Sequence, residues 1–157
     1  MRRIEAGAGT LGLSGRAQPP PQYQGLGQSD LLRDLPVTWV IVDEGYVPLD
    51  DPHSNAGMIE KTLFARGKPD LHRFLRFRTE LNDPALTADE FDREWLSLGI
   101  DRLDIATLGI GDDGHTASLF PGTTAFTVDD RIATAVHVPK LNAWRVTLTK
   151  TVIRDAA

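Results

Sequence analysis

The feature that most constrains the fold is the continuous apolar run Val37–Val42, which is followed directly by acidic and turn-forming residues. A short run without a polar residue at every second position is typical of a strand buried on both faces of a parallel sheet. Parallel strands are joined by crossover helices, so strands and helices should alternate along the chain. Further strand candidates are Thr10–Leu13, Arg73–Phe77, Leu103–Leu108, Ile132–Val138 and Trp144–Thr149. We therefore predict an α/β fold with an open, mostly parallel, Rossmann-like sheet and helices on both faces.

The clearest helix signal is the segment Thr87–Leu98. Thr87 can act as its N-cap, and Glu90 lies three residues later, as in a capping box. Apolar side chains then recur on one helical face. Gly99 provides the residue that commonly ends a helix. We expect this helix to cover one face of the sheet.

The remaining segments carry weaker signals. A second helix should begin at Ser54 or Asn55 and end near Phe64, and the proline-rich segment before residue 30 predicts at best a short helix from about Tyr23. Residues 43–55 contain two prolines and four acidic residues, which favours a loop. A length of 157 residues fits one core, so we predict a single domain over residues 1–157.

Composition excludes several classes of protein. The net charge is −5 and no cluster of Lys and Arg occurs, so a nucleic-acid surface is not expected. No apolar run approaches the ~18 residues of a membrane span, and Glu5 with nearby glycines interrupts any signal peptide. The absence of cysteine excludes disulfides, cysteine-based zinc sites and a thiol nucleophile. We expect a cytoplasmic protein that is a monomer or a weak homo-oligomer.

The glycine-rich segment at residues 109–115, GIGDDGH, follows a predicted strand and therefore lies where open α/β folds bind ligands. Its glycines formally match a dinucleotide-binding fingerprint, but Asp112 and Asp113 would repel a pyrophosphate, and His115 would have no role there. Asp113 stands two residues before His115, close enough to orient the imidazole. Free amides at the turn and at a following helix start can bind an anion. The alternative is that His115 only caps or packs.

Four segments together resemble the 6-phosphogluconolactonase family. GIGDDGHTASLFPG is similar to its signature loop, VTWVIVDEGYVPLDDPHSN to its acidic DER loop and Ser-Asn pair, VPKLNAWRVTLT to its lysine-bearing segment, and SGRAQPP to its SGGSTP-type loop. The resemblance covers Leu11–Ile153. Glucosamine-6-phosphate deaminases share the DGH loop but usually continue with Ile-Ala-Phe-Asn, unlike Thr116–Leu119 here.

The resemblance implies hydrolysis of 6-phospho-glucono-1,5-lactone, a sugar phosphate of the pentose phosphate pathway, without metal or cofactor. It gives His115 the role of general base, with Asp113 orienting it, and Lys140 that of phosphate ligand. Amides of the 109–114 turn would stabilise the oxyanion. The other substrate-binding residues that it implies are Ser14, Gly15, Arg16, Asp43, Gly111, Gly114 and Arg145.

The sequence also departs from the family pattern. Gly45 stands where the family has a phosphate-binding arginine, and Arg16 stands where it has a glycine, so we hypothesise that Arg16 partly replaces that arginine. Family members have further elements before and after the matched region, so the predicted sheet is incomplete at both termini. These departures leave open a non-catalytic sugar-phosphate-binding or vestigial domain, and a deaminase-like isomerase is a further alternative.

Overall fold

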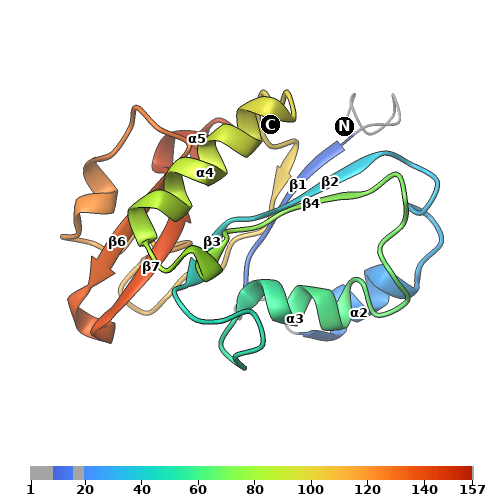
Figure 1. Ribbon diagram of the computed structural model, residues 1–157, viewed down its shortest axis with the longest axis horizontal. Helices are drawn as coiled ribbons and strands as arrows, with labels where there is room; N and C mark the ends of the chain where they lie inside the picture. Colours follow the sequence, from blue (N-terminus) through green and yellow to red (C-terminus); the bar gives the residue numbers. More distant parts are fainter. Residues whose placement is uncertain (1–8, 16–19, 157) are drawn as a thin grey trace.

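The computed structural model describes residues 9–15 and 20–156. A parallel sheet has the strand order β4-β2-β1-β5. Its strands are β1 (Gly9–Leu13), β2 (Val37–Ile41), β4 (Arg73–Leu75) and β5 (Ile105–Ala106). Helices α2 (Pro20–Gln28) and α3 (Asn55–Thr62) lie on one side of this sheet, and α4 (Pro84–Ser97) lies on the other (Figure 1). The predicted α/β fold with a parallel sheet and helices on both faces is confirmed.

A second, antiparallel sheet follows in the order β3-β7-β6, formed by β3 (Asp43–Gly45), β6 (Ala133–Val138) and β7 (Ala143–Leu148). Val42 joins the two sheets, because its amide donates to Leu13 O and its carbonyl accepts from Leu148 N. The prediction that residues 43–55 form only a loop is therefore wrong at its start. Three polar or glycine residues become a strand because β7 supplies their hydrogen-bonding partners.

The centre of the core is β2, where the Val40 and Ile41 side chains are fully buried. The apolar run therefore forms the buried parallel strand that it predicts, with β1 and β4 as its neighbours. On the α4 side, Phe77 stacks on Phe91 with ring centroids 4.2 Å apart. α4 packs mainly on β6 and β7 and also contacts β4, so it links the two sheets.

Helix α4 begins earlier than predicted. Its N-cap is Asp83, whose carboxylate accepts from Leu86 N, and Pro84 occupies the first turn, where a missing N–H has no cost. Thr87 is instead fully buried, and its hydroxyl donates to Arg78 O. The predicted end is confirmed, since Gly99 has the left-handed backbone with φ of +66°.

The other helices begin at prolines or at a serine cap. α2 starts at Pro20, three residues before the predicted Tyr23. α3 follows the predicted cap, because Ser54 Oγ accepts from Gly57 N. A short α5 (Lys150–Arg154) and 3₁₀ turns at Thr79–Leu81, Thr124–Thr127 and Pro139–Leu141 complete the described elements.

The segment after β5 differs most from the sequence prediction. Only two residues of Leu103–Leu108 pair as a strand, although Leu103 is fully buried. No helix begins directly after the glycine-rich turn, so the predicted helix start there is wrong. The chain instead closes on itself, with Gly111 N donating to His115 O and Leu119 N donating to Thr116 O. No helix among the described residues is long and apolar enough to cross a membrane.

Candidate active site

A pocket of about 350 Å³ lies beside the junction of the two sheets, where the chain leaves β1, β2 and β5. This is the carboxyl edge of the parallel strands, the usual ligand-binding edge of open α/β sheets. The predicted site residues that line it are Ser14, Gly15, Asp43, Gly111, His115, Lys140 and Arg145. Segments far apart in the sequence therefore meet around one cavity.

Asp113 and His115 form a locally closed turn. Asp113 Oδ1 accepts from the His115 backbone amide at 3.1 Å and lies 2.5 Å from His115 Nδ1. With Nδ1 held by a carboxylate, Nε2 is the ring nitrogen left for a ligand. The predicted orienting contact is thus present, although its catalytic role remains a prediction.

Packing fixes the His115 ring from two other directions. The ring stacks on Phe120 with centroids 4.0 Å apart and an interplanar angle of 22°. On another side lies Gly111, where an added Cβ would be 2.1 Å from His115 Cε1. The side chain is only 27% exposed. Glycine at position 111 is therefore required for the ring to occupy this place.

Lys140 contacts the same carboxylate from the 3₁₀ turn between β6 and β7. Its Nζ lies 3.2 Å from Asp113 Oδ2. The hydrogen bonds from His115, and then that from Lys140, hold the pKa of Asp113 well below its usual range. Asp113 is therefore a carboxylate at neutral pH, shared between an imidazole and an ammonium group.

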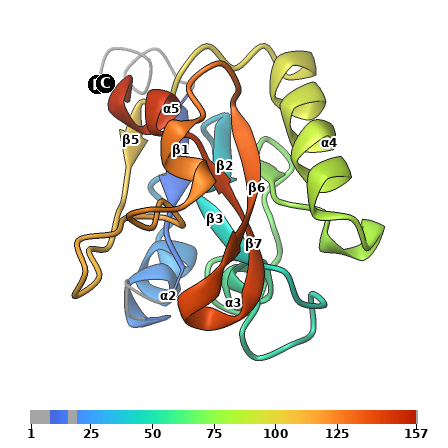
Figure 2. The same cartoon turned by 90° about the vertical axis from the view of Figure 1, so that its left-hand side faces the viewer.

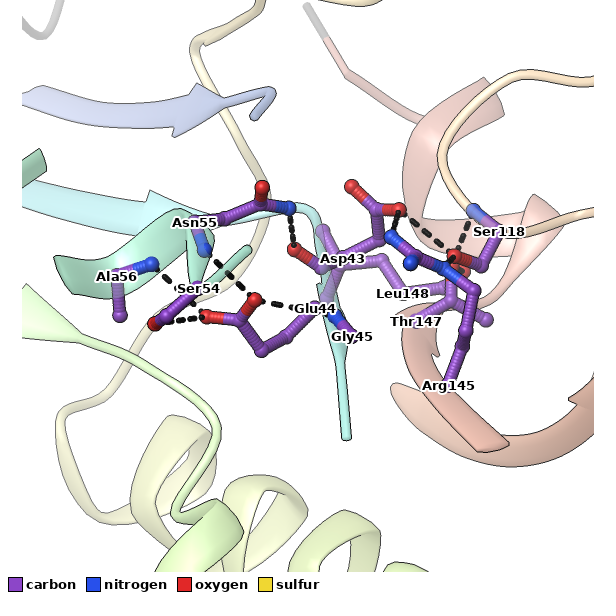
Figure 3. Close-up of polar contacts among 10 residues, drawn as sticks. All are labelled: Asp43, Glu44, Gly45, Ser54, Asn55, Ala56, Ser118, Arg145, Thr147 and Leu148. Atoms are coloured by element: carbon purple, nitrogen blue, oxygen red, sulfur yellow. Dashed lines mark hydrogen bonds and ion pairs between the residues drawn. The ribbon is translucent and has the colours of Figure 1, made fainter. Parts of the chain in front are cut away.

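Asp43 and Glu44 on β3 point in opposite directions (Figure 3). Asp43 Oδ2 accepts from Arg145 at 2.9 Å and from Ser118 Oγ at 2.7 Å. Arg145 Nε also donates to Ser118 Oγ. These contacts tie Ser118, just after the glycine-rich loop, to both β3 and β7, and Asp43 and Arg145 line the pocket.

Glu44 faces the start of α3 (Figure 3). Its carboxylate accepts from the amides of Gly45, Asn55 and Ala56 and from Ser54 Oγ. The side chain is 1% exposed, and burial raises the pKa of Glu44 to about 7, against the lowering effect of the amide donors. Glu44 thus anchors the end of the loop that connects β3 to α3.

A sequence model of the family described as "Glucosamine-6-phosphate isomerases/6-phosphogluconolactonase" matches residues 2–157. The chain belongs to this family. It is 36% identical over 137 residues to a 6-phosphogluconolactonase of Synechocystis sp., a match that covers 83% of this chain and 56% of the relative. It is 32% identical over 162 residues to the 6-phosphogluconolactonase of Mesorhizobium japonicum, covering 97% of this chain and 65% of the relative.

Solved structures agree with the family assignment. The fold matches a 6-phosphogluconolactonase from Trypanosoma cruzi with a TM-score of 0.81 at 28% identity, covering 99% of this chain and 67% of that one. A 6-phosphogluconolactonase from Shewanella baltica matches with a TM-score of 0.84 over the same shares, at 24% identity, and shows the fold alone. The chain spans 56% of the length of the first two curated relatives.

Two predicted site glycines have structural roles in this family member. The Gly114 amide donates to Gly111 O, and the Gly111 amide donates to His115 O. Gly114, with φ of +84°, shapes the turn without lining the pocket. The Gly111 and Gly114 amides therefore already have acceptors within the turn, which differs from the free donors expected from the sequence. Their role in oxyanion binding stays a prediction.

The first strand supplies another wall of the pocket. Ser14 is 4% exposed, and its Oγ has no hydrogen-bonding partner among the described residues. An added Cβ at Gly15 would overlap the Asn55 side chain, so glycine allows this approach to α3. Arg16, the predicted substitute for the missing arginine, lies outside the described residues.

His53, Ser118 and Phe120 were not predicted as site residues from the sequence. Local sequence does not single out Ser118, because its hydrogen-bonding partner is distant in the sequence. It does not single out Phe120 either, because that contact is a ring stack. His53 did carry a local signal, because Asp51 and His53 have the same spacing as Asp113 and His115. Among the described residues, no group of three or more His, Asp or Glu side chains is placed to hold a metal ion.

Proposed function

We propose that this chain hydrolyses 6-phospho-D-glucono-1,5-lactone to 6-phosphogluconate. The observation that carries the proposal is the Asp113–His115 pair, held against Phe120 and Gly111 in the wall of a pocket that also contains Lys140 and Arg145. The names of the relatives and of the matched structures support the same reaction. We also propose that residues 1–157 form a single domain and that the protein is cytoplasmic. It would be a monomer or weak homo-oligomer, and its reaction would need no cofactor.

In the proposed reaction His115 is the general base. Its Nε2 takes a proton from a water molecule as the water oxygen attacks the lactone carbonyl carbon. The resulting oxyanion re-forms the carbonyl and breaks the bond to the ring oxygen. The imidazolium returns its proton to that oxygen, which leaves as a hydroxyl group. Asp113 fixes the tautomer and stabilises the transient imidazolium.

Positive charge for the phosphorylated substrate comes from Lys140 and Arg145 in the proposed complex. Arg145 is fixed by Asp43 and Ser118, so its guanidinium is oriented before a ligand binds. Lys140 is 62% exposed and reaches the pocket from a separate turn. Ser14 and Gly15 line the same pocket.

The test is lactone hydrolysis measured above the spontaneous background for the wild type and His115→Ala. We expect the variant to lose about 10²–10⁴-fold in kcat while retaining its thermal midpoint. His137→Ala is the matched control, because His137 is exposed on β6 outside the pocket. Equal rates for wild type and His115→Ala would refute the proposal, and release of ammonia from glucosamine 6-phosphate would favour the isomerase activity instead.

A further inference from the structure

A second Asp-x-His turn, Asp51–His53, lies in the loop between β3 and α3, and its His53 lines the pocket. Asp51 Oδ1 accepts from the His53 backbone amide at 2.7 Å and lies 3.0 Å from His53 Nδ1. The Asp113–His115 turn has the same two contacts. In both turns the carboxylate engages Nδ1, which leaves Nε2 for a ligand.

The surroundings of the two rings differ. The His53 side chain is 68% exposed, whereas that of His115 is 27% exposed and stacked on Phe120. An exposed imidazole is poorly confined for proton transfer, but it can bind a charged group that remains partly in water. His53 is therefore suited to ligand binding at the mouth of the pocket.

The positions of the two loops indicate which part of a ligand each histidine meets. In the view of Figure 2 the loop before α3 emerges to the right of the β6–β7 hairpin and the loop after β5 to its left, and both loops contribute to the pocket lining. In the proposed reaction the lactone carbonyl lies at His115. The phosphoryl group is at the other end of the six-carbon substrate, away from His115.

The charges of the pocket also favour a phosphate contact at His53. Arg145 is paired with Asp43 at 2.9 Å, and Lys140 with Asp113 at 3.2 Å, so each cation already faces a carboxylate. The charge of each cation is therefore partly offset, so a further donor would strengthen the binding of a phosphate dianion. His53 lines the same pocket, and an imidazole whose Nδ1 faces a carboxylate can donate from Nε2 to a second anion when both ring nitrogens carry a proton.

We propose that His53 binds the phosphoryl group of the sugar-phosphate ligand through Nε2, with Asp51 as the positioning residue. The choice of ligand rests on the proposed function. Binding through Nε2 gives a contact that depends on the phosphoryl group and is independent of proton transfer at His115.

The experiment compares dissociation constants for 6-phosphogluconate and for gluconate, which lacks the phosphoryl group. We expect His53→Ala to weaken 6-phosphogluconate binding about five- to tenfold and gluconate binding less than about twofold, as for loss of one exposed charged hydrogen bond. His53→Lys should recover most of the affinity, and His137→Ala should bind both ligands like the wild type. Equal weakening for both ligands, or none, overturns the inference.

A titration of the histidine side-chain NMR signals separates this inference from the proposed function. Inorganic phosphate and 6-phosphogluconate should both shift the His53 signals, whereas gluconate should not. Lactone hydrolysis without any response of His53 overturns the inference and leaves the proposed function standing. A phosphate response of His53 without hydrolysis supports the inference and refutes the proposed function.

Discussion

The Asp51–His53 and Asp113–His115 turns have the same local hydrogen bonds but different environments. In each turn the aspartate stands two residues before the histidine, and this spacing places the imidazole against the carboxylate. Only His115 has an aromatic ring against its face and a glycine at its edge. Local spacing orients a histidine, whereas its surroundings decide whether the ring is confined enough for proton transfer.

Among changes that leave both histidines in place, the largest expected effect comes from filling the space beside His115. In Gly111→Ala the new Cβ would overlap the imidazole, so the ring must leave its place on Phe120. We expect kcat for lactone hydrolysis to fall about a hundredfold, as for a misplaced catalytic group. Gly25→Ala is the control, since an added Cβ there meets no atom within 4 Å. Unchanged kcat in Gly111→Ala would show that confinement does not distinguish the two turns.

The same substitution in both turns tests the comparison directly. Asp113→Asn should lower kcat about ten- to a hundredfold, because the amide neither fixes the tautomer nor stabilises the imidazolium. Asp51→Asn should raise KM about two- to threefold and leave kcat unchanged, as expected for an exposed ion pair. Steady-state kinetics with the lactone measure both constants. Equal falls in kcat would mean that both histidines take part in proton transfer.

The smallest effect on turnover is expected at Glu44, which holds the residues directly after His53. Burial raises its pKa from 4.5 to about 7 in the folded state. Between these values the unfolded state binds fewer protons than the folded state, so the contribution of Glu44 to stability falls as pH rises.

Glu44→Gln removes this titration. Relative to the variant, the wild type should lose roughly 1–3 kcal/mol of unfolding free energy between pH 5 and pH 8. Urea unfolding across this range measures the difference, with Glu60→Gln, an exposed residue of α3, as control. A difference that is constant with pH contradicts the prediction. If Glu44→Gln changes stability but not KM, the His53 turn keeps its shape without the contacts of the Glu44 carboxylate.

Several features of the molecule follow from local sequence. The apolar run of β2 requires a buried strand, Ser54 caps α3, and Gly99 ends α4 in a left-handed conformation. The Asp113–His115 contact also belongs to this group, because two residues of separation allow only a few geometries. The Ser54 cap, the Gly99 helix end and the Asp113–His115 contact depend on neighbours a few residues away, and the β2 strand follows from its apolar run, so all of them can be predicted from local sequence.

Other features required the tertiary structure. β3 becomes a strand only because β7 lies beside it, and Arg145 reaches Asp43 from 102 residues away. Asp83 rather than Thr87 caps α4, since packing buries Thr87 and places its hydroxyl on Arg78 O. Phe120 and Gly111 confine the His115 ring, and the same pocket is lined by His53 and His115. Local sequence accounts for β2, the Ser54 cap, the Gly99 helix end and the Asp113–His115 contact; long-range packing decided the different burial of His53 and His115.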